Sequence, residues 1–294
     1  GALVEVLEHN TETVVGRYYQ EGGVGFVLPY NRRISQELVI PPDGQGEARD
    51  GQMVIAAIVE QPTKRTQPIG RIIEVLGDHM APGMEVEIAL RSHEIPWQWS
   101  ERVETEVGKL KPSIPASAKR GREDLTGLPL VTIDGEDARD FDDAVYAERH
   151  GRGWRLLVAI ADVAHYVRPG TALDEAALER GTSVYFPSRV IPMLPEILSN
   201  ELCSLKPQVD RLCMVCEMHI SANGDIRDYR FLEGVMHSAA RLTYAQVAAV
   251  VEEGQAAARR RLEHLLPQLE SMHDLYQLLR RRRDRRGAID FEPP

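Results

Sequence analysis

Six acidic residues lie within a stretch of only twelve, from Thr132 to Asp143. Carboxylates this close together repel one another and raise each other's pKa unless a cation compensates their charge. Hard divalent ions prefer oxygen ligands, and a pair of ions about 4 Å apart needs several carboxylates to share. The stretch therefore predicts a metal-dependent site. Its acidic residues are Asp134, Glu136, Asp137, Asp140, Asp142 and Asp143.

The neighbouring elements are expected to bring four of these aspartates together. The apolar run 128–133 is typical of a buried strand, so Asp134 is expected where that strand ends. A turn at Gly135 then folds the chain back and places the later aspartates beside Asp134. Because Mg²⁺ usually takes one or two carboxylates and completes its shell with water and phosphate, four aspartates suit phosphoryl transfer better than a structural ion. These four are Asp134, Asp140, Asp142 and Asp143.

Two simpler interpretations of the acidic stretch can be weighed against this site. A calcium-binding EF-hand loop starting at Asp134 would need an oxygen ligand at Ala138 and a glycine at Arg139, so it fails at both positions. An exposed acidic turn is the usual meaning of a charge run. Here the preceding apolar strand and the interposed Phe141 favour a site over a solvated turn.

The region around the aspartates has the pattern of a sheet followed by helices. Apolar runs at 144–146 and 154–161 flank a hairpin turn and predict two further strands. Three segments have helical spacing. The first is 173–181, the second follows a capping box at Thr243, and the third is 262–279. In the third, Pro267 either sits in the first turn or kinks the helix.

The first part of the chain has a different pattern, with short β-like runs separated by turn residues. Five such runs in about 65 residues fit a small closed barrel of the oligonucleotide-binding type better than a sandwich, which needs about seven strands. The runs are 14–19, 24–28, 37–40, 53–59 and 70–76. A polar, proline-interrupted stretch at 91–127 is expected to be a surface linker.

Aromatic and basic residues are mixed in the barrel region, as in domains that hold single strands by stacking and phosphate contacts. Alternation along a strand sends about half of those aromatics into the core. The predicted RNA-binding residues of the barrel are Tyr18, Phe26, Arg32, Arg33, Lys64 and Arg65.

The composition limits the class of protein. The 294 residues carry a net charge of −10, so binding to nucleic acid must use local basic patches. An apolar fraction of 43% predicts a globular chain, and no apolar stretch is long enough to span a membrane. Three cysteines are too few for a disulfide framework and favour a reducing cytoplasm. The start Gly1-Ala2-Leu3-Val4, which lacks an initiator Met, is expected to lie inside a longer protein.

Several motifs occur in a fixed order along the chain. They are VGRYY at 15–19, GFVLP at 25–29, LVTIDGEDARDFDDAV at 130–145, VAIADV at 158–163, GTSVYFP at 181–187, IPMLP at 191–195 and LCSL at 202–205. Together they resemble the ribonuclease II superfamily and, within it, the bacterial ribonuclease R family. The resemblance covers most of the chain. It implies an α+β multidomain architecture, with a cold-shock (OB-fold) domain at 1–90, a linker at 91–127, and the first part of an α/β RNB catalytic domain at 128–294.

The resemblance also implies an activity. It makes Asp134, Asp140, Asp142 and Asp143 the metal-binding and catalytic residues of a 3′-to-5′ exoribonuclease that uses Mg²⁺, or alternatively Mn²⁺. Tyr185 matches the tyrosine that stacks on the base at the RNA 3′ end. Such an enzyme degrades single-stranded RNA processively to nucleoside 5′-monophosphates, with the 3′ end in the catalytic channel.

Other interpretations remain open at this point. The family places an essential arginine after the region ending at Glu292, so the chain alone is expected to be a very weak nuclease or an RNA-binding fragment with a metal-binding acidic site. A calcium-binding adaptor is a third possibility. The arginine run 280–286 suits either phosphate contacts or a helix C-terminus, and Cys213-x-x-Cys216 suits core packing better than a metal. His165 and Tyr166 follow a predicted strand and are given no role.

Overall fold

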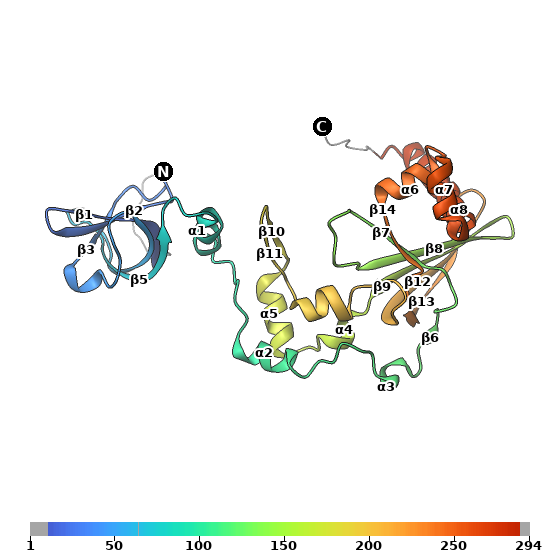
Figure 1. Cartoon of the computed structure of the whole chain (residues 1–294), viewed down its shortest axis with the longest axis horizontal. Coiled ribbons are helices and arrows are strands. Elements are labelled where there is room, and N and C mark those ends of the chain that lie inside the picture. Colours follow the sequence, from blue (N-terminus) through green and yellow to red (C-terminus); the bar gives the residue numbers. More distant parts are fainter. Residues whose placement is uncertain (1–10, 64, 289–294) are drawn as a thin grey trace. The chain divides into compact units, whose positions relative to one another are not determined.

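The computed structural model describes residues 11–63 and 65–288. The chain divides into two compact units (Figure 1). The first unit contains Gly1–Trp99 and Ser183–Ile191, and the second contains Ser100–Thr182 and Pro192–Pro294.

The first unit is built on a closed five-stranded barrel with the strand order β1-β2-β3-β5-β4. The strands are β1 (Thr13–Glu21), β2 (Val24–Pro29), β3 (Leu38–Ile40), β4 (Gln52–Glu60) and β5 (Ile69–Asp78). Closure pairs the strand edges, and alternate side chains fill the interior, where Val27, Leu38 and Val54 are fully buried. The predicted barrel of the oligonucleotide-binding class is therefore confirmed. A short 3₁₀ turn, η1 (Pro42–Gly44), and the helix α1 (Met84–Ser92) complete it.

A two-stranded hairpin belongs to the same unit although it comes later in the sequence. It consists of β10 (Val184–Phe186) and β11 (Arg189–Ile191), paired antiparallel. Arg189 Nη1 donates to Glu87 Oε1 of α1 at 2.9 Å and its guanidinium lies 5.6 Å from the ring of Trp97. These contacts attach the hairpin to α1.

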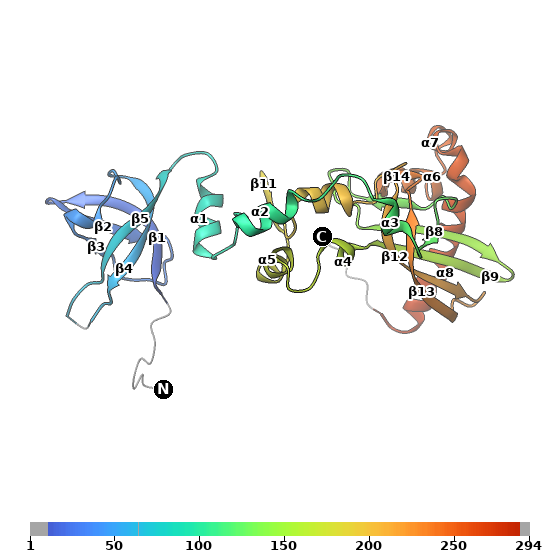
Figure 2. The ribbon, with the colours of Figure 1, turned by 90° about the horizontal axis from the view of Figure 1, so that it is seen from below.

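The second unit contains a seven-stranded sheet with the order β14-β7-β8-β9-β12-β13-β6, whose long central strands run side by side (Figure 2). The strands are β6 (Glu123–Asp124), β7 (Val131–Asp134), β8 (Asp143–His150), β9 (Gly153–Ala161), β12 (Arg211–Ile220), β13 (Ile226–Met236) and β14 (Ala240–Thr243). The β8–β9 and β12–β13 pairs are hairpins, while β14 and β6 add parallel edges.

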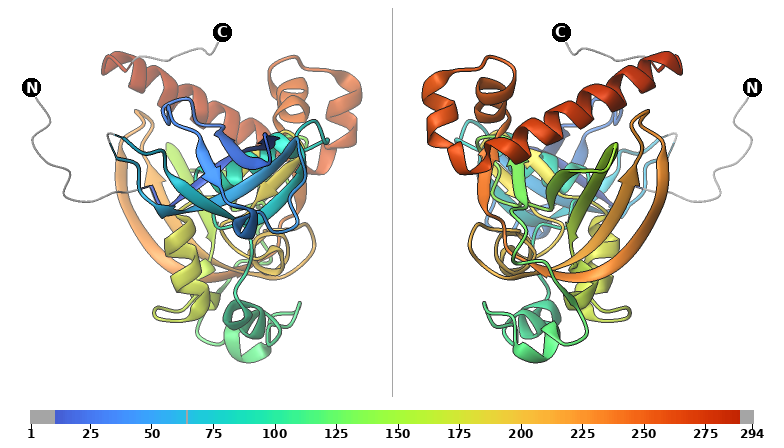
Figure 3. Two further views of the ribbon diagram at one scale, coloured as in Figure 1. Left: turned by 90° about the vertical axis from the view of Figure 1, so that its left-hand side faces the viewer. Right: turned by 90° about the vertical axis from the view of Figure 1, so that its right-hand side faces the viewer.

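The second unit also contains nine helical elements within the described residues. They are α2 (Glu101–Val107), α3 (Ala116–Lys119), α4 (Val163–Tyr166), α5 (Ala172–Arg180), the π-helix η2 (Ile197–Leu202), α6 (Tyr244–Val251), α7 (Ala256–Arg261), the 3₁₀ turn η3 (Glu263–Leu265) and α8 (Leu266–Arg285). Of these, α6 and α8 pack against the sheet. The long helix α8 crosses the sheet (Figure 3, right), where Leu275 packs against Ala147, Trp154 and Ile220. Pro267 lies in the first turn of α8, one of the two positions expected for it.

The stretch 91–127 is more regular than a surface linker. α1 crosses residue 90, and α2 begins at Glu101 after the N-cap Ser100, whose side chain accepts a hydrogen bond from the Val103 amide. The strand β6 joins β13 of the large sheet. The prolines of this stretch interrupt any long periodicity, so the short elements between them leave no pattern that a sequence reading can detect.

A row of alternating charges crosses the second sheet. Arg155 of β9 pairs with Glu217 of β12 and, at 3.1 Å, with Glu148 of β8. Arg230 of β13 pairs with Glu217 at 2.5 Å and with Glu123 of β6 at 3.1 Å. Because the Glu217 side chain is only 6% exposed, this ion-paired row links five strands through a nearly buried position.

Candidate active site

The acidic stretch connects two neighbouring strands at one edge of the second sheet. Asp134 is the last residue of β7 and Asp143 is the first residue of β8, and these strands pair antiparallel at Val131 and Val145. The loop between them contains Asp140 and Asp142. The strand-end position expected for Asp134 is therefore correct, and the loop returns to the strand beside it.

The electrostatics of Asp134 show that the four aspartates act on one another. Burial raises the pKa of Asp134, and the charges of Asp143, Asp140 and Asp142 raise it further, while Arg241 opposes the shift. Loss of hydration around its carboxyl, followed by the charges of Asp140 and Asp143, likewise raises the pKa of Asp142. A cation near these carboxylates would remove the repulsion.

One oxygen of this group lacks a partner. Asp134 Oδ2 is buried and receives no hydrogen bond. Burying a carboxylate oxygen without a hydrogen-bond donor costs free energy. A hard divalent cation can compensate this cost, because carboxylate oxygens are its preferred ligands. Within residues 11–63 and 65–288, no three His, Cys, Asp or Glu side chains are arranged to hold a metal ion. Mg²⁺ needs only one or two protein carboxylates when substrate phosphate and water complete its shell, so the donor set fits this ion.

An arginine from the neighbouring edge strand holds the loop. β14 pairs in parallel with β7, with Arg241 opposite Thr132. Arg241 Nη2 donates to the carbonyl oxygen of Glu136 at 2.5 Å and to that of Gly135 at 3.0 Å. Its guanidinium also lies 5.3 Å from the ring of Phe141. The sequence analysis missed Arg241. The sequence feature that could have indicated it is a single basic residue in a short strand, just before the capping box at Thr243.

The other end of the loop is anchored by a buried serine. Ser204 Oγ accepts a hydrogen bond from the Phe141 amide at 3.1 Å and donates to the carbonyl oxygen of Arg139 at 3.2 Å. The Leu205 amide donates to the carbonyl oxygen of Phe141 at 2.8 Å, and the Phe141 side chain is 8% exposed. Phe141 therefore anchors the loop in the core, and Ser204, which lies in the LCSL motif, fixes the backbone on both sides of Asp140.

Exposed side chains surround the aspartates on the sheet. Asp143 is the register partner of Ile160, which is the partner of Met214, and these two apolar residues are 46% and 40% exposed. Tyr244, 66% exposed, follows Thr243, the register partner of Asp134. The aspartates thus border an open surface with apolar and aromatic side chains, which the sequence analysis did not identify.

Tyr185 lies in the other unit of the chain. It belongs to β10 of the hairpin attached to α1 and is 69% exposed. The described geometry of the acidic site therefore does not include Tyr185, and its stacking role stays a prediction.

The barrel places its predicted RNA-binding residues in different environments. Tyr18 is fully buried in the barrel core, with Gly25 leaving room for its ring, so the prediction that Tyr18 binds RNA is wrong. Alternation along β1 explains the error, because Tyr19, its neighbour, points the other way and stacks on Phe26 at 5.4 Å. Phe26 is partly exposed, and Arg65 is exposed in the β4–β5 loop. Lys64 lies outside the described residues.

Arg32 and Arg33 lie in a groove of about 1020 Å³ between the barrel and α1. Tyr30, 54% exposed, and Arg17 line the same groove with His79 and His93. This mixture of cations and an exposed aromatic within one concave surface matches the requirements for binding a single strand.

The remaining candidates are the two cysteines of β12 and two residues of α4. Cys213 is fully buried and lies three residues from Cys216 on the extended strand β12, so their side chains point to opposite faces and core packing is confirmed for Cys213. His165 and Tyr166 lie in α4, which Asp162 caps, and burial raises the pKa of Tyr166 to about 12. None of the described helices is long and apolar enough to cross a membrane.

Comparison with protein families agrees with this architecture. The RNB domain family matches residues 122–294, and the Cold shock domain family matches residues 26–100. Ribonuclease R of Escherichia coli is 56% identical over 291 residues, which cover 99% of this chain and 36% of that protein. The chain therefore spans about a third of the length of this relative.

Solved structures give the same result. The structure of Mycoplasma genitalium RNase R in complex with double-stranded RNA superposes with a TM-score of 0.88 and 27% identity, covering 98% of this chain and 51% of that one. The same enzyme in complex with ribose methylated single-stranded RNA also gives a TM-score of 0.88, with coverage of 99% and 46%. The chain belongs to the RNB domain family and is a relative of bacterial ribonuclease R.

Proposed function

We propose that this chain is part of a cytoplasmic 3′-to-5′ exoribonuclease that hydrolyses single-stranded RNA processively to nucleoside 5′-monophosphates. The observation that supports it best is the buried Asp134 Oδ2, which has no hydrogen-bond partner and lies beside three further aspartates. A structural acidic turn would satisfy this oxygen or expose it to water. The similarity to ribonuclease R and the RNA complexes of the Mycoplasma enzyme support RNA as the substrate.

The residues of the site have distinct roles in this proposal. Asp134, Asp140, Asp142 and Asp143 would hold Mg²⁺ or Mn²⁺ through their oxygens, and such an ion would supply activation of water and stabilisation of the charge that develops on the phosphate. Arg241 and Ser204 hold the loop backbone, so the carboxylates keep their positions when the substrate binds. Ile160, Met214 and Tyr244 form the adjacent surface over which the last nucleotides can lie.

The barrel contributes RNA binding. Its groove contains Arg17, Arg32 and Arg33 around the exposed ring of Tyr30, and three or four cations of this kind give a modest, sequence-tolerant affinity. Tyr185, exposed in β10, is proposed to stack on the 3′-terminal base.

The test uses a 5′-labelled single-stranded RNA with a radioactive 3′-terminal phosphodiester and the full-length product of the gene. We expect Mg²⁺-dependent release of the labelled nucleoside 5′-monophosphate from the 3′ end, seen by thin-layer chromatography. Asp142→Asn should slow this release about 10²- to 10³-fold while RNA affinity stays nearly constant, because it removes an electrostatic contact made in the transition state. Asp137→Asn, a charge loss in the same loop, is the matched control.

The same assay separates the proposal from its alternative. An RNA-binding chain with an acidic site that does not catalyse would bind the RNA and release no nucleotide, in either metal. Release of internal fragments, or release that continues in EDTA, would contradict the proposed reaction. Chain 1–294 tested alone should release nucleotide far more slowly than the full-length product, since it spans 36% of its Escherichia coli relative.

A further inference from the structure

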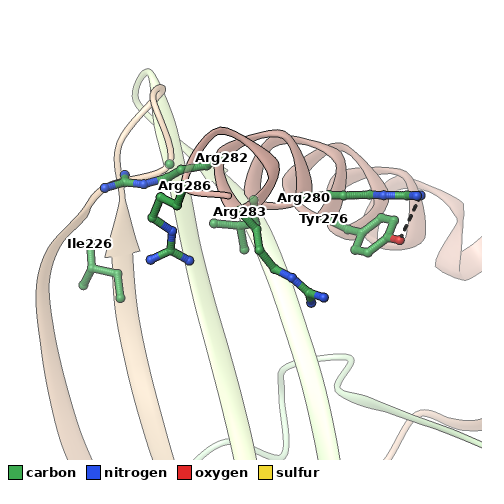
Figure 4. Close-up of a pocket in the computed structure, with 8 residues that line it drawn as sticks. Ile226, Tyr276, Arg280, Arg282, Arg283 and Arg286 are labelled. Atoms are coloured by element: carbon green, nitrogen blue, oxygen red, sulfur yellow. Dashed lines mark hydrogen bonds between the residues drawn. The ribbon is translucent and has the colours of Figure 1, made fainter. Parts of the chain in front are cut away.

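A groove lined by arginines lies on the second unit, away from the acidic loop. It runs between the C-terminal half of α8 and the turn that joins β12 to β13, with a volume of about 620 Å³ (Figure 4). Its walls are formed by Gly224, Ile226, Tyr276, Leu279, Arg280, Arg282, Arg283 and Arg286. This volume lies within the range of about 300–1,000 Å³ typical of ligand clefts.

The spacing of the arginines places them on one face of the helix. Tyr276, Arg280, Arg283 and Arg286 follow one another at intervals of three or four residues, so their side chains lie along a single stripe. Figure 4 shows the side chains of Arg283 and Arg286 extending from α8, with Arg280 beside the ring of Tyr276. Arg281 and Arg285 do not line the groove, although both are exposed in the same helix.

The opposite wall is fixed by close packing. Gly224 has a φ of +82° in the β12–β13 turn, and a Cβ at this position would meet Arg282 Cδ and Leu278 Cγ at 3.4 Å. Arg282 forms an ion pair with Asp225 of the same turn. The helix and the hairpin therefore form the groove as a preformed feature of the fold, and Ile226, 57% exposed, lines it from the hairpin.

We propose that this groove binds the sugar–phosphate backbone of RNA, as a site separate from both the acidic loop and the barrel. Residues 280–286 contain six arginines and one aspartate in a chain whose net charge is −10, so the positive charge is concentrated at this place. Guanidinium groups bind phosphate with paired hydrogen bonds, and the half-exposed ring of Tyr276 offers a surface for a base. The choice of RNA over another polyanion rests on the proposed function.

A simpler explanation is that the arginines balance the negative end of the α8 dipole. That effect depends on distance from the helix terminus and is equal for arginines on any face. It accounts for Arg281 and Arg285 as well as for Arg283 and Arg286, but it does not account for the alignment of the latter pair with Arg280 and Tyr276 along a preformed groove. The two pairs therefore make matched variants.

The experiment compares chain 1–294 with the double variants R283Q/R286Q and R281Q/R285Q. Each removes two positive charges from the same helix, and glutamine retains a high helix propensity, which circular dichroism would verify. Binding of a fluorescent single-stranded RNA is measured by anisotropy in EDTA over a range of salt. For R283Q/R286Q we expect about tenfold weaker binding at low salt and a log–log salt slope shallower by about 1.4, because each lost phosphate contact contributes about 0.7.

The control variant R281Q/R285Q should bind nearly as well as the unchanged chain. RNA containing 4-thiouridine should cross-link to the peptide that contains Tyr276, and this cross-link should be lost in R283Q/R286Q. Equal weakening by both double variants, or by neither, would overturn the proposal. Polyglutamate that displaces RNA as effectively as RNA of equal charge would assign the groove to an acidic protein segment instead.

This result can be separated from that of the proposed function. If the groove variant loses RNA binding but the full-length product releases no nucleotide, the groove proposal stands and the nuclease proposal fails. If nucleotide is released and R283Q/R286Q binds RNA normally, the nuclease proposal stands and the groove proposal fails.

Discussion

Arg241 Nη2 donates a 2.5 Å hydrogen bond to the carbonyl oxygen of Glu136, across 105 residues of sequence. Through this contact the edge strand β14 holds the loop that carries the acidic residues. The guanidinium grips backbone oxygens and at the same time opposes the raised pKa of Asp134. Arg241 is thus a positioning residue for the carboxylates, and its charge matters as well as its hydrogen bonds.

Replacing Arg241 should therefore impair the site without unfolding the sheet. We expect Arg241→Ala to weaken Mg²⁺ binding, because the loop loses its clamp and the carboxylates lose a compensating charge. The measurement is isothermal titration of Mg²⁺ into chain 1–294, with Arg152→Ala in the β8–β9 turn as control. Arg241→Lys keeps the charge but not the fork of donors, so it should restore only part of the affinity. Unchanged Mg²⁺ affinity in Arg241→Ala would contradict the role of Arg241 as a positioning residue.

The repulsion among the aspartates predicts a metal-dependent stability. The raised pKa values of Asp134 and Asp142 mean that these groups favour folding when protonated and lose that contribution as pH rises through the raised values. Mg²⁺ should consequently raise the melting temperature more at about pH 8 than at about pH 5, where protons compete for the carboxylates.

Asp142→Asn should raise the melting temperature in EDTA and reduce the gain produced by Mg²⁺. Differential scanning fluorimetry at both pH values, with Asp137→Asn as the control, measures both effects. A Mg²⁺ response equal at the two pH values would show that the ion does not bind the ionised carboxylates.

The charged row across the second sheet predicts a different pH dependence. Burial alone would raise the pKa of Glu217, but hydrogen bonds from Arg155 and Arg230 outweigh it and lower the pKa below its ordinary 4.5. The ionised Glu217 therefore stabilises the fold fully at pH values above its ordinary pKa. This stabilisation is lost as the pH falls through the lowered pKa of Glu217.

Removal of the Glu217 carboxylate leaves Arg155 and Arg230 without their shared partner. Glu217→Gln should destabilise the second unit by about 2 kcal/mol at neutral pH. This is less than for a fully buried pair, because the carboxylates at both ends of the row, Glu148 and Glu123, are exposed. Hydrogen exchange of the β9 and β12 amides measures the loss, and Glu123→Gln at one exposed end should cost far less. Equal effects of the two substitutions would refute the central role of Glu217.

Affinity of the barrel for RNA should depend on the groove beside α1. R32Q/R33Q should make the salt slope of RNA binding shallower by about 1.4, from an expected value near −2 to −3 for the barrel. R49Q/R71Q removes two exposed arginines that do not line this groove and serves as the control. Tyr18→Phe should leave affinity unchanged, since Tyr18 is buried. A barrel that binds RNA normally without Arg32 and Arg33 must use another face.

The elements with strong local patterns could be predicted from the sequence. Alternating apolar residues gave the five barrel strands, and the apolar run before Asp134 placed this residue at a strand end. The short helices and β6 within 91–127 could not be predicted, because they are held by distant contacts. Glu106 of α2, for example, accepts hydrogen bonds from the amides of Ala172 and Leu173 at the start of α5.

The same distinction applies to the acidic site. The four aspartates lie within ten residues of one another, so the sequence alone predicts that they form one site. Arg241 and Ser204 lie more than sixty residues away in sequence, and they reach the loop only through sheet pairing and packing. The turn itself differs from expectation, since the φ of Gly135 is not in the left-handed region and a Cβ there would meet no atom within 4 Å. Backbone contacts from Arg241, rather than the freedom of glycine, shape this loop.

The parallel pairing of β14 with β7 also has a consequence for the order of events during synthesis. Because chains emerge from the ribosome N-terminus first, the aspartates appear about a hundred residues before the strand that clamps their loop. The pairing closes a long loop of sequence that contains β8, β9, β12 and β13, so we expect it to form late. A nascent chain that ends before Arg241 therefore carries all four aspartates with their loop unclamped, and we expect the proposed metal site to be completed only after β14 has paired with β7.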